Sequence, residues 1–401
     1  MPDTRARRRK LVEKLVEDGQ IRSARVAAAF EAVPRELFVP GVPLDEVYRS
    51  SEAILIKRVD GVGVSSASAP DVMATMLELL HVEPGMRVLE IGAGTGYNAA
   101  LLAHLVGDNG SVVSIDIDAD LVDAARAHLA QAGYQDQVEV VEADGALGYM
   151  AKAPYDCIML TVASRDLAPA WRDQLAPDGR LLLPLSIRGP QRCVVFQNQQ
   201  DHLTSRGVGG CSFIPLRGVL AMDPVRLPLD GEGALMVSVA GDVSPVSAAG
   251  VLTLLGIANE TWSTGVRTTP DNVRQGLHVW LAGHDAAVCS FWAEANTRAL
   301  PDLYGQMERV RGSLGLLDHD GLAVLAWSEQ GELLVRWPPG SAALAGRLVG
   351  HVQSWSARGR PLDAALRIRA FDRAATPAIA PHEVVIDQRW TRFLLSWHPI
   401  F

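Results

Sequence analysis

The 401-residue sequence has no surplus of positive charge, no hydrophobic run long enough to cross a bilayer, and few cysteines. Its 37 lysines and arginines are outnumbered by 46 aspartates and glutamates. The resulting formal charge of −9 argues against nucleic acid as the main partner, because phosphates require a basic surface. The basic start leads into a charged helical pattern rather than a signal peptide, so we expect a cytoplasmic protein without a membrane partner.

The spacing of cysteines and histidines argues against a bound metal. No Cys-x-x-Cys pair, His-x-x-x-His pair or Cys/His group is present, which favours reduced and mostly buried thiols. Hydrophobic residues make up 48% of the chain and charged residues 21%, which is typical of a packed protein, and the length is sufficient for two domains. The cysteines are Cys157, Cys193, Cys211 and Cys289.

Residues 1–218 have the pattern of a single α/β domain. Helices are expected at 4–19 and 23–33, the first with Leu11, Leu15 and Val16 on one face. From residue 82 to 196, short apolar strands alternate with helices, which predicts a doubly wound, mostly parallel sheet that binds its ligand at the carboxyl ends of the strands. Strands are expected at 87–91, 111–116, 138–144, 157–162, 179–185 and 193–198, with helices at 98–105 and 120–131.

The character of the sequence changes beyond residue 218. Residues 219–247 mix prolines, glycines and acids, as a linker does, and residues 248–401 are expected to form a separate α+β domain. Eight of the nine tryptophans lie in this second part, where they suit either a peptide-binding groove or an ordinary core. Its patterns predict a helix at 247–258, a strand at 277–283, and further apolar segments at 321–327, 332–337, 365–371 and 391–397.

A glycine-rich turn, "LEIGAGTGYNAALLA", follows the first expected strand and opens a helix. Gly92, Gly94 and Gly96 allow a tight turn and a close approach of the backbone to a ligand. A dinucleotide-binding Gly-x-Gly-x-x-Gly pattern would need glycine where Tyr97 stands. The Gly-x-Gly-x-Gly pattern preceded by Glu90 instead resembles the motif of Rossmann-like, class I methyltransferases that use S-adenosylmethionine (SAM).

Two acids stand at the ends of the next two expected strands. Asp116 is placed to accept hydrogen bonds from the ribose hydroxyls of SAM, and Asp144, with Gly145, to accept one from its adenine amino group. Together with Glu90 and the glycines, these residues are the expected cofactor site. The alternative interpretation is a structural turn with two aspartates that cap helices.

Several segments resemble protein L-isoaspartate O-methyltransferases and occur in the order of that family. They cover the chain up to about residue 218. In that family a serine before an Ala-Pro or Gln-Pro pair lies beside the transferred methyl group and holds the substrate carboxylate. Ser68, followed by Ala69 and Pro70, occupies this position. The segments are residues 19–40, 66–80, the glycine turn, 155–163, 176–185 and 212–218.

A serine suits the chemistry that this resemblance implies. A carboxylate is already nucleophilic at pH 7, so displacement at the sulfonium methyl group is limited by orientation and desolvation and needs no general base. The hydroxyl of Ser68 can orient the carboxylate without neutralising it. Ser65 and Ser66 can donate to the same carboxylate or to the substrate backbone, and helix capping is the alternative role of all three serines.

Two features depart from the repair enzymes of the family. The stretch "VSSASAP" lacks their usual threonine and isoleucine before the serine, and the chain continues far beyond residue 218. Both features resemble the peptide-tailoring branch, called FxLD-system methyltransferases and associated with lanthipeptides. This resemblance implies O-methylation of an aspartate in a ribosomally made, modified and macrocyclic peptide. S-adenosylhomocysteine is then the other product, and the ester proceeds to aspartimide or isoaspartate.

Two other functions stay open at this point. One is an isoaspartyl methyltransferase that repairs damaged proteins. The other is a peptide-binding protein that has kept the fold without catalysis, against which the intact glycine turn, Asp116 and Asp144 argue. In the peptide-tailoring interpretation we expect the second domain to recognise the peptide, whereas in a repair enzyme it would be an appendage without that role. The sequence does not define the peptide, the aspartate or the oligomeric state.

Overall fold

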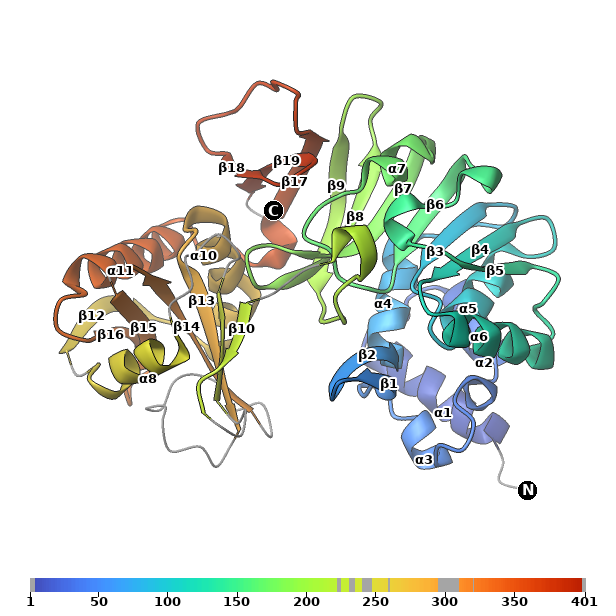
Figure 1. Cartoon of the computed structure of the whole chain (residues 1–401), viewed down its shortest axis with the longest axis horizontal. Helices are drawn as coiled ribbons and strands as arrows, with labels where there is room; N and C mark the ends of the chain where they lie inside the picture. The colour runs from blue at the N-terminus through green and yellow to red at the C-terminus, as the bar shows by residue number, and fades with distance from the viewer. Residues whose placement is uncertain are drawn as a thin grey trace.

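The computed structural model describes residues 4–221, 225–230, 235–239, 247–258, 260–294, 310–319 and 321–398. These residues form two lobes, each built around one large sheet (Figure 1). The first lobe contains residues 4–221 together with the strands at 366–397, and the second lobe contains the elements between them. None of the helices in the described part of the chain has the length and hydrophobicity needed to span a membrane.

The N-terminal helices are those predicted, α1 (Thr4–Glu17) and α2 (Ala24–Ala32). The face expected for α1 is wrong at Val16, which is half exposed, because α1 packs through Leu11, Val12 and Leu15. Three short segments follow before the first sheet. They are η1 (Arg35–Phe38), α3 (Leu44–Val47) and an antiparallel hairpin of β1 (Ile54–Val59) and β2 (Val62–Ala67).

The first lobe holds a ten-stranded sheet in the order β18-β19-β17-β9-β8-β7-β6-β3-β4-β5. The strands from β5 to β7 are parallel, and those from β7 to β18 are antiparallel, so the predicted mostly parallel core is confirmed. The strands within residues 87–210 are β3 (Arg87–Ile91), β4 (Ser111–Asp116), β5 (Val138–Glu142), β6 (Tyr155–Leu160), β7 (Leu175–Ser186), β8 (Gln191–Asn198) and β9 (Leu203–Gly210).

The two faces of this sheet bury different sets of side chains. The longer helices contribute to a core on one face, which includes Val88, Met159 and Leu182 of the sheet. The opposite face is covered by short elements and by a helix of the second lobe, α10 (His278–His284). The long helices are α4 (Pro70–Leu80), α5 (Tyr97–Val106) and α6 (Ala119–Ala132), and the short elements are η2 (Gly145–Leu147), η3 (Met150–Lys152), α7 (Pro169–Asp173) and η4 (Gly218–Leu220).

The second lobe holds a seven-stranded antiparallel sheet in the order β10-β11-β13-β14-β15-β16-β12. The long helix α11 packs on β12, β15 and β16 and buries Trp355. Its strands are β10 (Val225–Pro228), β11 (Leu235–Val239), β12 (Glu260–Arg267), β13 (Val288–Glu294), β14 (Val310–Asp318), β15 (Gly321–Trp327) and β16 (Glu332–Trp337), and its other helices are α8 (Ala248–Gly256), α9 (Pro270–Asn272), η5 (Val273–Leu277), α11 (Ala342–Ala357) and η6 (Asp363–Ala365).

The strand predicted at 277–283 is wrong, since these residues belong to the end of η5 and to α10. Residues 279–283 are buried on every side of the helix, because α10 lies between the two lobes. A short segment that is apolar all round has no periodicity that separates a buried helix from a strand. The helix at 247–258 is confirmed within one or two residues, and the apolar segments at 321–327, 332–337, 365–371 and 391–397 form strands.

The chain is divided differently from the expected domains in two places. Strands β10 and β11 lie within the expected linker, of which residues 222–224, 231–234 and 240–246 are outside the described part. The last strands, β17 (Leu366–Asp372), β18 (Val384–Asp387) and β19 (Thr391–Trp397), return to the first sheet, where β17 pairs with β9. A separate domain over 248–401 therefore does not describe this topology.

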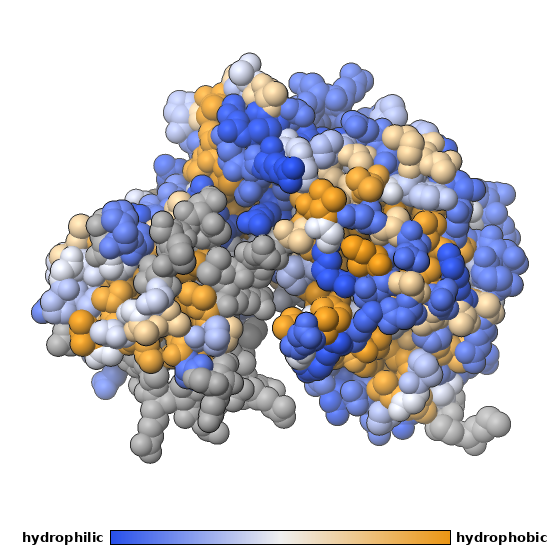
Figure 2. All heavy atoms as spheres, viewed as in Figure 1, coloured by the Kyte–Doolittle hydropathy of each residue, from blue (hydrophilic) through white to orange (hydrophobic). Residues whose placement is uncertain are grey.

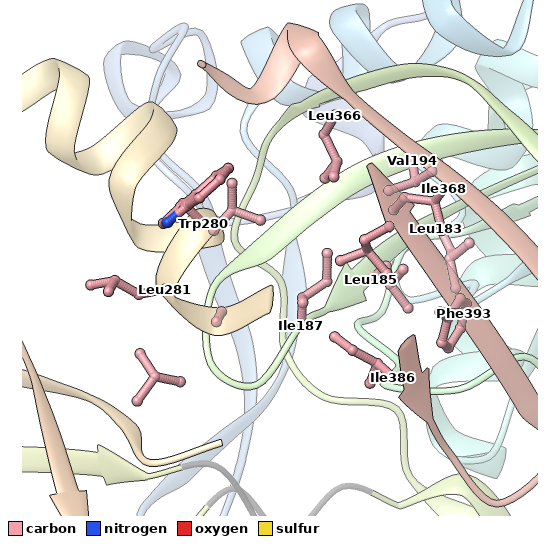
Figure 3. Close-up of a cluster of buried hydrophobic side chains, with 14 of the residues drawn as sticks. Leu183, Leu185, Ile187, Val194, Trp280, Leu281, Leu366, Ile368, Ile386 and Phe393 are labelled. Atoms are coloured by element: carbon pink, nitrogen blue, oxygen red, sulfur yellow. The ribbon is translucent and has the colours of Figure 1, made fainter. Parts of the chain in front are cut away.

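Hydrophobic packing accounts for the return of these strands. Leu185 of β7 and Ile187, just after β7, share one core with α10 on one side and with β17, β18 and β19 on the other (Figure 3). Strand periodicity indicates that a segment is a strand but does not identify its neighbour. Only the folded chain shows that β17 completes the first sheet rather than the second.

Candidate active site

Two adjoining cavities open at the carboxyl ends of β3 and β4, as expected for a parallel sheet of this kind. The first has a volume of about 590 Å³, open solvent at its mouth included, and the second about 320 Å³. Ser66, Gly92, Gly94 and Thr161 line both. The first is also lined by Val64, Ser65, Ile91, Ile115, Asp116, Ile117, Gly145, Val162 and residues 214–217, and the second by Ala67, Ser68, Met73, Ala93, Thr95, Tyr97 and Asn98.

The three glycines of the turn serve different purposes. All three have positive φ, but a Cβ atom on Gly92 would lie 2.5 Å from Thr161 Oγ1, so packing against the protein itself requires that glycine. Gly96 begins α5 in the left-handed region and lines neither cavity. Gly94 is the one whose Cβ would enter the space beside Ser65 Oγ and Ser66 O, at 3.7 and 3.8 Å.

Glu90 lies beneath the turn and does not reach either cavity. Its side chain is completely buried, with Oε1 accepting a hydrogen bond from Asn98 Nδ2 at 2.7 Å and Oε2 one from the Ser114 hydroxyl. Burial raises the pKa of Glu90 to about 7 from its ordinary value of 4.5. The expected direct contact of Glu90 with the cofactor is therefore not supported, because neither cavity is lined by Glu90. Its carboxylate instead joins β3 to β4 and α5.

Asp116 lies where the sequence places it, at the end of β4 and in the wall of the first cavity. Its Oδ2 accepts a hydrogen bond from the Gly94 amide at 2.8 Å, so it also fixes the glycine turn. Burial raises the pKa of Asp116. Asp118, two residues further on, accepts hydrogen bonds from Arg217 Nη1 at 3.1 Å and from Arg217 Nη2 at 2.7 Å. Its Oδ2 lies 3.0 Å from Lys57 Nζ.

Asp144 is used differently from the expectation. Its Oδ1 accepts from the Ala146 amide at 2.9 Å, and its Oδ2 accepts from the Val219 amide at 2.7 Å. Asp144 thus caps η2 and attaches η4 to η2, which is close to the alternative interpretation of a capping aspartate. Asp144 is not among the residues that line either cavity. Gly145 does line the first cavity, and a Cβ atom there would lie 2.3 Å from Ile91 Cγ2.

The three serines stand on two walls. Ser65 lines the first cavity, Ser68 the second, and Ser66 both. In the described part of the chain, the hydroxyl of none of them has a hydrogen-bond partner. The residue that caps α4 is Ala69, so capping of α4 does not explain these serines. Their hydroxyls are therefore available to a ligand.

Several residues of the site were missed from the sequence. Thr161 donates from Oγ1 to the carbonyl oxygen of Gly92 at 2.7 Å and lines both cavities. Residues 214–217 close the first cavity, and Arg35 lies buried behind Ser68. Thr161 and residues 214–217 fall in segments that resemble the family, so their position after β6 and β9 was the available signal.

The sequence pattern of the family Protein-L-isoaspartate(D-aspartate) O-methyltransferase (PCMT) matches residues 6–220. The chain belongs to this family. It is a SAM-dependent protein carboxyl O-methyltransferase, and the first lobe is its methyltransferase lobe. A Cβ atom on Gly94 would meet only Ser65 Oγ and Ser66 O, at ordinary contact distances, and from here the first cavity, where SAM is expected, is called the cofactor cleft.

Relatives match the methyltransferase lobe over nearly their whole length. The chain is 40% identical to Protein-L-isoaspartate O-methyltransferase of Hyperthermus butylicus over 222 residues, 53% of this chain and 90% of that protein. It is also 40% identical to the enzyme of the same name from Methanopyrus kandleri over 215 residues, 53% of this chain and 92% of that protein. These alignments leave the second lobe without a counterpart in either relative.

One solved structure does match the second lobe. It is described as a protein-L-isoaspartate O-methyltransferase, is 22% identical, and covers 90% of this chain and 96% of its own, with a TM-score of 0.51. This likeness shows a common fold. From the extra length of the chain we expected a difference from the repair enzymes. A second lobe alone does not distinguish this chain from proteins of that description.

Proposed function

We propose that this enzyme methylates the free α-carboxylate of isoaspartyl residues in polypeptides, and that Ser68 donates the hydrogen bond that orients this carboxylate. The observation that carries the proposal is the lining of the second cavity. Among the described residues that line it, Tyr97 is the only one with an ionisable side chain, and burial raises the pKa of Tyr97 to about 12. The cavity thus has no general base at neutral pH, which suits a nucleophile that is already an anion.

The residues of the cofactor cleft have separate tasks in this proposal. SAM supplies a methyl group on a sulfonium centre and leaves as S-adenosylhomocysteine when the carboxylate oxygen takes that methyl group. Gly92 and Gly94 leave room for the cofactor, and Asp116 offers it a carboxylate. Gly145 forms another part of the wall of the cleft. Glu90, Gly96 and Asp144 act indirectly, by holding the turn and η4 in place.

The serines are assigned by the cavity that each one lines. Ser68 faces only the second cavity, so it is the donor to the substrate carboxylate, while Ser65 faces only the cofactor cleft. Ser66 lines both and can contact either molecule. We assign recognition of the wider polypeptide to the second lobe, whose strands β10 to β16 are absent from the methyltransferase lobe.

A second candidate substrate is a normal aspartate in a modified, macrocyclic peptide of the lanthipeptide kind. It is favoured by the two positions before Ser68, where Ser66 and Ala67 stand in place of the threonine and isoleucine usual in repair enzymes. The identity of 40% with two enzymes named for isoaspartate favours the first candidate. The two candidates differ in the carboxylate that is methylated, and this can be measured.

The experiment uses two peptides that differ only in the linkage at one residue, aspartyl or isoaspartyl, together with a macrocyclic version of the aspartyl peptide. Mass spectrometry after incubation with SAM reports the methyl ester and its loss of methanol. Methylation confined to the isoaspartyl peptide supports the proposal. Methylation of the macrocyclic aspartyl peptide alone supports the second candidate, and binding of SAM without methylation of any peptide contradicts both.

A further inference from the structure

The outer surface of the methyltransferase lobe does not by itself indicate how a substrate is selected. Figure 2 shows hydrophobic residues interspersed with hydrophilic ones over the visible face of this lobe, which is the right-hand lobe in that view. The walls of the second cavity are more informative, because they contain buried polar groups. Ser68, to which we assign the substrate carboxylate, belongs to the same walls, so these groups can meet the same molecule.

Asn98 is a buried residue of these walls whose hydrogen bonds are incomplete. It is 8% exposed and lines the second cavity but not the cofactor cleft. Its Nδ2 donates to Glu90 Oε1 at 2.7 Å and lies 3.6 Å from Met159 Sδ. Among the described residues that line the second cavity, Asn98 Oδ1 is the one buried side-chain oxygen without a hydrogen-bond partner.

The chemistry of an amide oxygen defines the partner that Asn98 lacks. Oδ1 can only accept hydrogen bonds, so the missing partner is a donor. A buried acceptor without a partner is unfavourable, and most buried polar groups in folded proteins are paired. Because Nδ2 is already bonded to Glu90 and Asn98 lines the second cavity, the molecule that occupies this cavity is the available source of the donor.

An isoaspartyl residue carries a donor next to its free carboxylate. Its α-carboxylate and its peptide N–H are bonded to the same carbon atom, so a substrate that places the carboxylate at Ser68 brings the N–H into the same cavity. In a normal aspartyl residue, one more carbon atom separates the side-chain carboxylate from the N–H. A single acceptor in the cavity wall can therefore distinguish the two linkages.

We propose that Asn98 Oδ1 accepts a hydrogen bond from the peptide N–H of the isoaspartyl residue and thereby selects this residue over normal aspartate. This inference rests on the proposed methylation of isoaspartyl residues. Ser68 binds the carboxylate and Asn98 binds the neighbouring N–H, so the two side chains together orient the carboxylate toward the methyl group of SAM. SAM is not the source of this donor, because Asn98 does not line the cofactor cleft.

The test compares an isoaspartyl peptide with a depsipeptide in which an ester oxygen replaces the nitrogen of that N–H. The replacement removes one donor and leaves the charge and the shape of the substrate nearly the same. In the wild-type enzyme, kcat/KM should be about 10–100-fold higher for the amide peptide, the usual effect of leaving one buried acceptor unpaired. Asn98→Ala should lower kcat/KM for the amide peptide to about that of the depsipeptide, and should leave the depsipeptide nearly unchanged.

Ser114→Ala is the matched control. It removes the other side-chain hydrogen bond to Glu90, at Oε2, and Ser114 lines neither cavity. The preference for the amide peptide over the depsipeptide should keep its wild-type value in this variant. Calorimetry should give the same affinity for SAM in Asn98→Ala and in Ser114→Ala, since both variants weaken the bonding of Glu90 and neither removes a group from the cofactor cleft.

Equal kcat/KM for the two peptides in the wild-type enzyme overturns the inference, and this comparison needs no variant. An unchanged preference for the amide peptide in Asn98→Ala, or the same loss of preference in Ser114→Ala, also overturns it. A greater loss of SAM affinity in Asn98→Ala than in Ser114→Ala would assign Oδ1 to the cofactor instead. These outcomes leave the proposed function intact, since the isoaspartyl peptide is methylated. Absence of methylation of that peptide, in an enzyme that still binds SAM, contradicts the proposed function and this inference with it.

Discussion

Arg35 donates a hydrogen bond of 2.9 Å from Nη2 to the carbonyl oxygen of Ser68. The same side chain donates from Nε to Val47 O at 3.1 Å, and its guanidinium group lies 4.8 Å from the ring centre of Tyr97. Arg35 is almost completely buried, and this burial lowers its pKa. Because Ser68 and Tyr97 both line the second cavity, Arg35 holds two of its walls in a fixed relation.

Arg35→Lys should lower kcat at least tenfold while leaving the affinity for SAM nearly unchanged. Lysine keeps the charge but has no planar fork, so it cannot bond Val47 and Ser68 together. Steady-state kinetics with calorimetry of SAM binding separates the two effects. The matched control is Arg25→Lys, since Arg25 donates to Leu105 O at 2.8 Å far from the cavities. An equal loss of kcat in both variants would indicate a general effect on stability.

Ser68→Ala should lower kcat about 10²–10³-fold, the usual effect of removing one positioned donor. The affinity for SAM should persist, because Ser68 does not line the cofactor cleft. Ser68→Thr keeps the hydroxyl but adds a methyl group in the second cavity, so we expect nearly the same loss. Ser65→Ala is the control from the other cavity. Near-normal turnover of Ser68→Ala would transfer the role to Ser66, which lines both cavities.

Lys57→Met should speed the release of S-adenosylhomocysteine about two- to fivefold and make release less sensitive to salt. Lys57 of β1 and Arg217 of the cleft wall both pair with Asp118, and their hydrogen bonds lower the pKa of Asp118. Exposed ion pairs contribute only about 0.2–1 kcal/mol, which limits the effect to this size. Stopped-flow measurement over a range of ionic strength tests it. Lys14→Met, which breaks the 2.8 Å pair between Lys14 of α1 and Asp18 just after it, should leave this release rate unchanged.

Glu90→Gln should raise the melting temperature at pH 8 and leave it nearly unchanged at pH 4. The pKa of Glu90 is raised to about 7 by burial, so the folded state binds this proton more tightly than the unfolded state. Stability from Glu90 is therefore full below pH 4.5 and is lost as the pH rises through 7, by on the order of 3 kcal/mol. Thermal unfolding at both pH values, with the exposed Glu13→Gln as control, measures the difference. If the melting temperatures of the wild type and Glu90→Gln differed by the same amount at both pH values, a raised pKa of Glu90 would be contradicted.

The sequence by itself determined the family, the class of enzyme and the character of most segments. The glycine turn between β3 and α5, Asp116 at the end of β4, and Ser68 before α4 are signals carried by neighbouring residues. Their meaning depends on local backbone geometry, which a few residues define. For the same reason the strands of the parallel sheet were predicted within a few residues.

Tertiary structure alone decided which residues meet. No local pattern shows that Asp144 bonds the Val219 amide, that Arg35 reaches the carbonyl oxygen of Ser68, or that β17 pairs with β9, because each contact joins segments far apart in the chain. The burial of Glu90 and the helical state of α10 likewise depend on what surrounds them. Hydrophobic periodicity indicates the type of an element only where one face is buried and the other is exposed. Because α10 is buried on all sides between the lobes, its sequence has no such periodicity.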